Sequence, residues 1–554
     1  MPVLSFFPRK FPVFYGHGVT FSSQAPAVTL EDGTIKLKTE TAQQSATGAS
    51  AGTHQLLLLF TPLWVSAYED GALAYRLPRP DRAAPYRLDC PSWLEPAPQD
   101  ALAVLCGDDS PLAAEDRAVL VLMLTGTDAA QPLISALADG EQKAALEGHL
   151  ERQVFAARKT AAINAAKQGQ RAEALTIVAH TLDRMPPPPA PRRDASRLAR
   201  PARKGAILGD FSLPQCRHYR VEQKLEQFAR LGIDVVCHEM PDTTSLCAAL
   251  PELDFLILYR LPLTPSLLDV IRDARHAAVP IAYETDDLLF DADAFPAPAE
   301  DYPANFGADE YAELQILPPM YLRAMALCDH VITSTPPLMQ RAGEMLGHDR
   351  LSVHVNGLDG RHAAAAACPR GREDGALRLF YGSGTKAQQS DFAALAADVL
   401  APFLSGHADV RLTVAGQVEL PSCLKAFASQ IQTLEPQNLQ DYWTALAAAD
   451  VFLAPLARNA FNDCKSAIKW LETANLGIAT VASKTPAFES VIRSGEDGYL
   501  CERAGEWLSA LEQLAARPEE ARRMGAQAHT RAMADFAAAK LDQNLAAIIA
   551  SLRS

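Results

Sequence analysis

The sequence predicts an α/β protein with two tandem Rossmann-like domains, preceded by a small β-rich or mixed domain and a helical connector. Short β-branched apolar runs alternate with helical patterns from about residue 205 to 360, and the alternation restarts at Leu377. Alternation of this kind is typical of parallel sheets covered by helices. The 554 residues, of which 48% are hydrophobic and 21% charged, leave room for about three globular domains.

Residues 1–145 predict a β-rich or mixed domain whose role no motif indicates. Glu31–Thr34 is a turn signal between two short strand-like runs, which suggests a hairpin. We interpret the apolar runs at residues 55–60, 102–106 and 118–124 as further strands.

Residues 146–185 change to a helical period, with small residues before Gly169 and apolar residues after it. The pattern resembles one tetratricopeptide-like hairpin, which cannot bury its apolar face alone. We therefore favour a helical connector packed on a neighbouring domain. Residues 186–204 are rich in proline and then in arginine, which predicts a stiff linker. A solvated linker is favoured, and contact with anionic lipid headgroups is the alternative.

The two Rossmann-like domains are predicted over residues 205–360 and 361–530, with a C-terminal helix over residues 531–554. Each buried strand should be short, apolar and followed by loop residues. The strands expected in the first domain lie at residues 206–209, 234–237, 255–258, 280–283 and 330–333.

Bulk properties exclude several classes of function. The net charge of −15 argues against a nucleic-acid partner, which would need a basic face. The ten cysteines include no C-x-x-C pair, so we expect reduced thiols, with no disulfide framework and no metal centre. No signal peptide and no apolar run of about 18 residues is evident, which predicts a cytoplasmic protein; peripheral association with the inner face of the membrane stays open. The oligomeric state is not indicated.

The stretch from Asn462 to Gly477 carries the most information about function. It lies between two apolar runs, residues 450–456 and 478–483, which are typical of buried parallel strands. A loop and a helix therefore begin at the carboxyl edge of a sheet, where open α/β sheets bind ligands.

Two cations and a carboxylate recur in this stretch at helical spacing. Lys465, Lys469 and Glu472 are four and three residues apart, so we expect them on one face of a helix. Together they suit a ligand that carries both a phosphate and a sugar diol.

A second ligand-binding signal follows the strand that starts the second Rossmann-like domain. Gly382, Ser383 and Gly384 form a short glycine-rich loop that ends at Lys386. Glycines let backbone N–H groups approach a phosphate, and the lysine can neutralise its charge.

From about Asp210 to the C-terminus, the chain resembles the GT-B nucleotide-sugar glycosyltransferases, in particular the retaining group-1 or family-4-like enzymes. The family's pair of glutamates keeps only its second member, Glu472, because Cys464 occupies the first position. The resemblance implies a metal-independent enzyme without a cofactor, and a last helix that crosses back to the first domain. The segments that carry it are Leu379–Lys386, Leu412–Gly416, Ala449–Leu456, Lys465–Gly477 and Ser494–Leu500.

The resemblance also implies roles for the donor-side residues. Lys386 and Lys465 would contact the donor diphosphate, and Lys465 would stabilise the charge that develops on the leaving group. Glu472 would accept hydrogen bonds from the ribose diol, and Lys469 would lie beside it. Asn462 could bond the donor sugar, although a helix-capping role for Asn462 or Asp463 is an equal alternative.

Polar residues that follow the first Rossmann strand are candidates for the acceptor side: Asp210, Arg217, Tyr219 and Arg220. The start of a helix favours an anion, so either arginine could contact a phosphate, with surface solvation as the alternative. Asp286 and Asp287 end another strand at the same edge. They could bind acceptor hydroxyls or accept a proton, while a structural cap role for Asp286 stays open.

These features predict a glycosyltransferase, of the hexosyl or deoxyhexosyl type, that moves a sugar from a nucleotide-diphosphate donor to a glycan, lipid-linked or protein acceptor. Retention of the anomeric configuration is implied by the resemblance. One alternative is a non-catalytic glycan-binding or scaffold protein with a degenerate site. A sugar-nucleotide epimerase on the same fold is the other.

Overall fold

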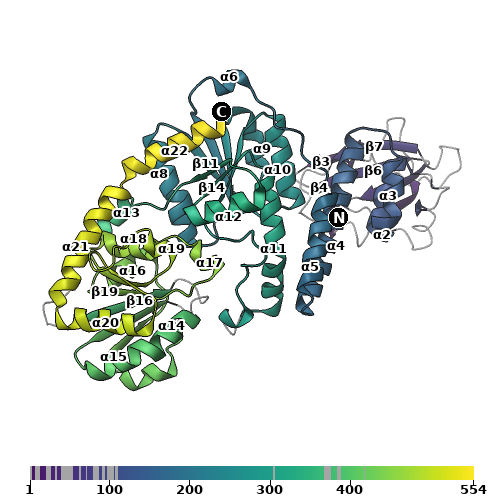
Figure 1. Ribbon diagram of the computed structural model, residues 1–554. Helices are drawn as coiled ribbons and strands as arrows, with labels where there is room; N and C mark the ends of the chain where they lie inside the picture. The colour runs from purple at the N-terminus through teal and green to yellow at the C-terminus, as the bar shows by residue number, and fades with distance from the viewer. Residues whose placement is uncertain are drawn as a thin grey trace. The chain divides into compact units, whose positions relative to one another are not determined.

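The computed structural model describes the backbone of the strands between residues 3 and 96, and then residues 105–106, 110, 112–125, 127–302, 306–366, 376–383, 389–416 and 418–553. The chain forms two compact units, Met1–Ala157 and Arg158–Ser554 (Figure 1). We call them unit 1 and unit 2 and describe each by itself.

Unit 1 contains two β-sheets and a group of helices. One sheet has the strand order β1-β8-β4-β3, and the other has the order β7-β6-β5-β2-β9. Strands β3 and β4 form the hairpin expected around Glu31–Thr34, whose end residues pair with each other. The bounds are β1 Val3–Phe6, β2 Val13–Val19, β3 Ala27–Glu31, β4 Thr34–Lys38, β5 His54–Phe60, β6 Trp64–Glu69, β7 Ala72–Pro78, β8 Tyr86–Asp89 and β9 Leu94–Pro96.

The apolar run at residues 118–124 is helical, so the predicted strand there is wrong. It belongs to α2 (Ala114–Thr125), in which Leu120 packs with Leu59 of β5. Asp116 in its first turn accepts a hydrogen bond from Ser66 of β6 at 2.9 Å. A helix that is buried on all sides has no polar face, so a short apolar run does not distinguish it from a strand. Most of the run at residues 102–106 lies outside the described residues.

Helices α3 (Thr127–Ser135) and α4 (Glu141–Lys167) follow, and α4 runs into unit 2. Gly169 closes the turn after α4 with a φ of +77°, a left-handed conformation that favours glycine. Helix α5 (Arg171–Arg184) then packs along α11 (Ala308–Ala326). Lys159 pairs with Glu313 of α11 at 2.5 Å.

Removing α5 is expected to destabilise unit 2. A chain that begins at Lys204 should melt at a lower temperature than one that begins at Arg158, because it lacks the buried side chains Val178 and Leu182 that α5 contributes. Losing two such side chains costs about 3 kcal/mol or more, which corresponds to roughly 5 °C or more. Calorimetry of both chains checks this, and equal melting temperatures would contradict it.

The first Rossmann-like domain contains a six-stranded parallel sheet with the order β11-β10-β12-β13-β14-β15. All five predicted strands are present, and β15 is an additional edge strand. Helices on both faces follow the strands, and two of them begin at threonine caps: Thr264 caps α10 (Pro265–His276) and Thr335 caps α12 (Pro336–Leu346). The strands are β10 Lys204–Gly209, β11 Asp234–Glu239, β12 Phe255–Tyr259, β13 Ile281–Thr285, β14 His330–Thr333 and β15 Leu351–Val353.

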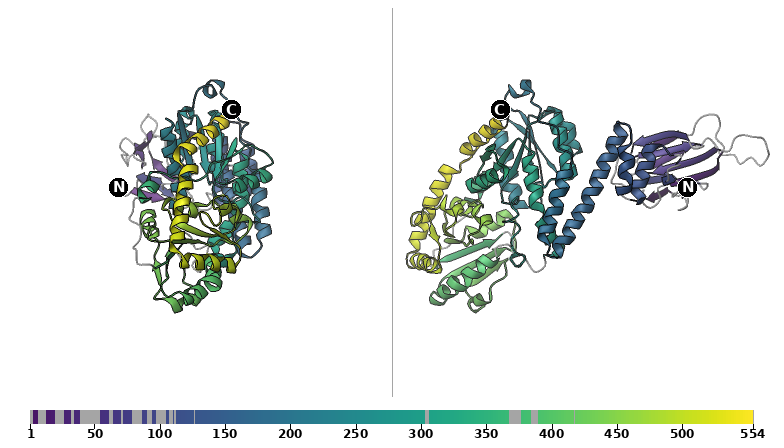
Figure 2. Two further views of the ribbon diagram at one scale, coloured as in Figure 1. Left: turned by 60° about the vertical axis from the view of Figure 1, so that its left-hand side comes forward. Right: turned by 45° about the vertical axis from the view of Figure 1, so that its right-hand side comes forward.

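The second Rossmann-like domain contains another six-stranded parallel sheet, with the order β18-β17-β16-β19-β20-β21. The strand order reverses between β16 and β19, which creates a topological switch point. Two tandem parallel sheets confirm the predicted α/β fold (Figure 2). The strands are β16 Arg378–Ser383, β17 Arg411–Gly416, β18 Ile431–Leu434, β19 Val451–Ala454, β20 Ala479–Ser483 and β21 Tyr499–Cys501.

The last two helices connect the second domain to the first. Helix α21 (Pro518–Asp535) packs on α18 (Ile468–Asn475). Helix α22 (Ala538–Arg553) then runs along α8 (Gln223–Arg230) of the first domain (Figure 1). Leu545 and Ile549 of α22 join the apolar core that contains Phe228. Arg230 and Asp542 form an ion pair at 2.8 Å beside this core.

Two negative findings concern only the described part of the chain. No described helix combines the length and apolarity that crossing a membrane requires. Each described cysteine is a free thiol.

Candidate active site

The candidate site lies within unit 2, where the carboxyl ends of the two parallel sheets come together. Phe295, from the loop after β13, stacks on Phe461 with the ring centroids 5.8 Å apart. The hydroxyl of Thr335, just beyond β14, donates to the carbonyl oxygen of Cys464 at 2.8 Å. These contacts join the first Rossmann-like domain to the loop and helix that follow β19.

Lys465 lies in the turn between α17 (Ala460–Asp463) and α18 (Ile468–Asn475), so the prediction that it shares a helix with Lys469 and Glu472 is wrong. The Lys465 N–H bonds the carbonyl oxygen of Asn462, which closes α17. Its ammonium nitrogen lies 5.3 Å from the centre of the Phe461 ring. The turn is held from the first domain, because Asn356 donates to the Ser466 hydroxyl at 2.9 Å.

Asn459 caps α17, and neither Asn462 nor Asp463 does. The Asn459 side chain accepts the N–H of Asn462 at 2.8 Å. The amide of Asn462 in turn donates to the carbonyl oxygen of Ala457 at 2.9 Å. These two hydrogen bonds of Asn462 therefore fix the loop after β19, next to the turn that carries Lys465.

Glu472 is buried at the interface between the two domains. Its Oε1 accepts hydrogen bonds from the Tyr219 hydroxyl at 2.9 Å and from Trp443 Nε1 at 3.3 Å. Its Oε2 is buried and has no hydrogen-bond partner among the described residues. Because Glu472 is only 1% exposed, a ligand reaches this oxygen only after a local movement at the interface.

Lys469 and the start of the glycine-rich loop lie near Tyr442. The Lys469 ammonium nitrogen is 3.5 Å from the Tyr442 hydroxyl, and burial lowers the pKa of this lysine. A Cβ on Gly382 would lie 2.6 Å from the same hydroxyl, so any larger residue near the end of β16 would have to displace the Tyr442 ring. Ser383 follows as the last residue of β16. Gly384 and Lys386 lie outside the described residues.

The acceptor-side candidates after β10 separate into exposed and buried residues. Asp210 is exposed and accepts the N–H of Ser212, while Arg217 is exposed and pairs with Glu222 at 3.1 Å. Tyr219 is the candidate that contacts the donor-side residues, through Glu472. It lies in the π-helical turn η1 (Arg217–Glu222).

Arg220 does not face a ligand space, because its guanidinium is engaged inside the first domain. It pairs with Glu284 at 2.7 Å and donates to Asn356 at 2.8 Å. Lys224 pairs with the same glutamate at 2.9 Å, and burial lowers the pKa of Lys224 to about 8. Arg220 therefore supports the site through Asn356, which donates to Ser466 next to Lys465.

Asp286 and Asp287 share one guanidinium, which the sequence did not identify. Arg260, just beyond β12, contacts Asp286 at 3.0 Å and Asp287 at 3.3 Å. Burial alone would raise the pKa of Asp286, but the charges of Arg260 and Arg220, together with hydrogen bonds, outweigh it and hold this pKa below the ordinary value. Burial and the Asp286 charge raise the pKa of Asp287, against the opposing charges of Arg260 and Lys465.

Arg260 also has an unusual backbone, with a φ of +52°. Strained backbone of this kind clusters at functional sites. Cys216 accepts a hydrogen bond from its guanidinium at 3.2 Å, and burial raises the pKa of this thiol to about 12. A polar residue directly after an apolar strand was the available sequence signal for Arg260.

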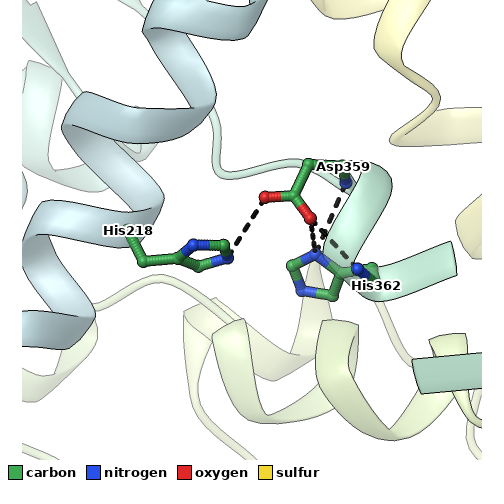
Figure 3. A group of neighbouring side chains, drawn as sticks. All are labelled: His218, Asp359 and His362. Atoms are coloured by element: carbon green, nitrogen blue, oxygen red, sulfur yellow. Dashed lines mark hydrogen bonds and ion pairs between the residues drawn. The ribbon is translucent and has the colours of Figure 1, made fainter. Parts of the chain in front are cut away.

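A second cluster that the sequence did not identify contains His218, Asp359 and His362 (Figure 3). Asp359 lies between the two imidazoles, 3.2 Å from His218 Nε2 and 2.7 Å from His362 Nδ1. Burial alone would raise the pKa of Asp359, but hydrogen bonds and charge from His362 hold it well below the ordinary value. By residue type, this is the group among the described residues that could hold a metal ion.

A cavity of about 370 Å³ opens beside the donor-side loop. Its lining includes Leu456, Lys484 and Glu502, which follow β19, β20 and β21, together with Asp391 and Trp507. The volume is in the range of small-molecule pockets. Asp391 also accepts the N–H of Ala457, so the cavity is continuous with the loop that leads to α17.

The comparison with known families decides what the second Rossmann-like domain is. Residues 378–517 match the family model described as Glycosyl transferases group 1. This segment is a group 1 glycosyltransferase domain. It includes the turn with Lys465 and the helix with Glu472. No curated protein matches the chain.

Part of the chain also resembles solved structures. HepE of Anabaena in complex with UDP is 13% identical, with a TM-score of 0.43 over 62% of this chain and 98% of that chain. A glycosyltransferase from Rickettsia africae is 9% identical, with a TM-score of 0.44 over 63% and 98%. Sucrose-phosphate synthase from Thermosynechococcus elongatus is 12% identical, with a TM-score of 0.44 over 62% and 97%.

Proposed function

We propose that the protein is a glycosyltransferase that moves a sugar from a nucleotide-diphosphate donor to a glycan, lipid-linked or protein acceptor, with retention of the anomeric configuration. The observation that carries the proposal is the placement of Lys465 and Glu472 on a group 1 glycosyltransferase domain, at the edge that meets the first Rossmann-like domain. A cation and a carboxylate there match the two polar ends of a nucleoside diphosphate.

On the donor side, each residue has a distinct task. Lys465 neutralises the diphosphate and stabilises the charge that develops on it when the bond to the anomeric carbon breaks. Glu472 accepts hydrogen bonds from ribose hydroxyls through Oε2, which has no partner among the described residues. Lys386 completes the phosphate contacts from the loop that starts at Gly382, and Lys469 adds positive charge beside Glu472.

On the other side, Asp287 receives the acceptor. Its carboxylate is half-buried next to Arg260 and faces the Lys465 charge across the site. It orients the incoming hydroxyl and can take its proton, with the leaving phosphate as a second proton acceptor. Asp286 is held more firmly by Arg260 and by the Tyr259 hydroxyl at 3.1 Å, so its task is to fix Arg260.

Thermal melting with a panel of nucleotide sugars tests the proposal. A donor at 100 times its Kd adds about 2.7 kcal/mol to the free energy of unfolding. The nucleotide sugar that binds is therefore the one that raises the melting temperature. Product analysis then distinguishes a glycosyltransferase from an epimerase and from a scaffold protein. A glycosyltransferase releases nucleoside diphosphate and forms a glycoside, whereas an epimerase converts the donor without release. A scaffold protein does neither.

Chelator treatment is expected to leave transfer unchanged. Lys465 and Lys386 supply the positive charge that a metal ion supplies elsewhere, so the leaving diphosphate needs no divalent cation. The check compares rates before and after EDTA and gel filtration. Loss of transfer that Mn²⁺ or Mg²⁺ restores would make Asp286 and Asp287 metal ligands and would contradict the assigned roles.

A further inference from the structure

Four buried side chains form a continuous series of hydrogen bonds that ends on Glu472, and we call this series the relay. Asp359 Oδ1 lies 2.7 Å from His362 Nδ1. His362 Nε2 lies 3.2 Å from the Tyr219 hydroxyl, which in turn lies 2.9 Å from Glu472 Oε1. Tyr219, His362 and Glu472 are 3%, 1% and 1% exposed, so the relay connects both Rossmann-like domains out of contact with water.

The direction of the last two links follows from the groups that can donate. Trp443 Nε1 also points at Glu472 Oε1, from 3.3 Å, which marks this oxygen as an acceptor. The Tyr219 hydroxyl therefore donates to Oε1, and its own oxygen can accept a hydrogen bond from His362 Nε2.

The backbone of His362 is also fixed to the helix that carries Glu472. The Asn475 amide of α18 donates to the carbonyl oxygen of His362 at 2.8 Å. His362 and Glu472 are therefore joined twice, through the backbone and through Tyr219. Two helices held in this way, α18 and α13 (Gly360–Ala366), keep their relative position.

We propose that His362, held by Asp359, is a positioning residue for donor binding, which acts through Tyr219 to fix Oε1 of Glu472 and leaves Oε2 for the ribose hydroxyls. The inference rests on the proposed function, because it takes Glu472 as the ribose ligand. Oε2 is the buried oxygen without a partner among the described residues, and a buried acceptor without a donor is unfavourable. A ribose hydroxyl supplies the missing donor.

A metal ion is the rival explanation for His218, Asp359 and His362. Arg361 Nη1 lies 3.2 Å from His218 Nδ1 and can only donate, so Nδ1 accepts and the ring proton is on Nε2. That proton faces Asp359 Oδ2 at 3.2 Å, although too obliquely for a good hydrogen bond. His362 Nδ1 is likewise engaged by Asp359. Metal binding would have to remove the His218 proton and displace the contact between His362 and Asp359, so the geometry favours the relay.

The test measures how strongly the protein distinguishes ribose from dideoxyribose. Calorimetry gives Kd for a nucleoside diphosphate and for its 2′,3′-dideoxy form, with UDP, GDP and ADP tried in turn and the tightest retained. The wild type is expected to bind the ribose form about tenfold or more tightly, because hydrogen bonds to a charged group contribute this much. Because both nucleotides carry the same diphosphate, the ratio of the two Kd values cancels effects on the phosphates.

His362→Gln and Tyr219→Phe are expected to lower this ratio to about threefold or less, with little change in Kd for the dideoxy form. The matched control is His330→Gln, which changes another buried histidine of the first domain, bonded to Ser352 at 2.8 Å. The control should keep the wild-type ratio.

The outcomes separate the inference from the proposed function. Equal weakening of both nucleotides by His362→Gln, or an unchanged ratio, overturns the positioning role. If Glu472→Gln keeps the wild-type ratio, the ribose assignment in the proposed function fails instead, and if none of the three nucleotides binds, the proposed function fails. One equivalent of zinc in the purified protein, lost in His218→Ala, would replace the relay by a metal site and overturn the inference.

Discussion

Replacing Lys465 with alanine is expected to lower kcat for transfer by about 10²-fold, the loss typical when one pre-organised charge partner of the developing negative charge is removed. The turn that carries Lys465 is held by Asn462 and by the bond from Asn356 to Ser466, neither of which involves the lysine side chain. The fold and the melting temperature should therefore change little.

Steady-state kinetics and a melting curve of Lys465→Ala check this result. Lys425→Ala is the matched control, because Lys425 is an exposed lysine of the same domain in η6 (Ser422–Phe427), remote from the site. Full activity of Lys465→Ala would remove the lysine from the diphosphate site. A loss of activity together with a large fall in melting temperature would show that the residue supports the turn instead.

Asp287→Asn is expected to reduce transfer by about 10²-fold or more, since general acid–base groups contribute 10² to 10⁴. Donor affinity should stay nearly unchanged, because Asp287 belongs to the first Rossmann-like domain. The donor-side residues Lys465 and Glu472 belong to the second. The substitution keeps the size of the side chain and removes its charge. A residue that only capped the strand end would tolerate it.

The pH profile adds a second check on Asp287. Its pKa is raised by burial and by the Asp286 charge, so it becomes protonated at a higher pH than an ordinary aspartate as the solution is acidified. Transfer by the wild type should fall as pH drops through this raised pKa, and the residual transfer of Asp287→Asn should lack this step. Asp293→Asn, at an exposed position of the following loop, is the control. Equal loss of donor binding and transfer would indicate damage to the whole domain.

The strand pattern of unit 2 was predictable because its sheets are parallel and buried on both faces. The runs near residues 255–258 and 330–333 consist mainly of apolar residues, as buried parallel strands do, and loop residues mark their ends. The run at residues 118–124 had the same character but forms part of α2. There the deciding factor was burial against β5, a tertiary contact that the local pattern does not contain.

The site was predictable where its residues follow a strand, and less so where they meet across the domains. Lys465 and Glu472 were found from their place after β19, but the turn at Ser466 that separates Lys465 from the helix depends on Asn356, 110 residues earlier. His362 lies in an alanine-rich stretch that resembles a connector. Its contact with Tyr219 arises only when the two domains come together, and its contact with α18 joins segments that are more than 100 residues apart.

Arg220 illustrates the same limit in the opposite direction. Its position at the start of a helix suggested an anion contact, but Glu284 ends up beside it because β10 and β13 belong to one sheet. The pairing turns a candidate ligand contact into internal support for Asn356. A sequence pattern places a residue at an edge of the sheet, and the partners that the fold brings there decide its task.

The most direct test of the account is the release of nucleoside diphosphate from a panel of UDP-, GDP- and ADP-sugars by the wild type and by Lys465→Ala, followed over time by chromatography. The account predicts that the wild type releases the nucleotide from at least one donor, and that Lys465→Ala releases it about 10²-fold more slowly. Release at equal rates by both proteins, or binding of a donor without any release in the presence of glycan acceptors, would contradict it.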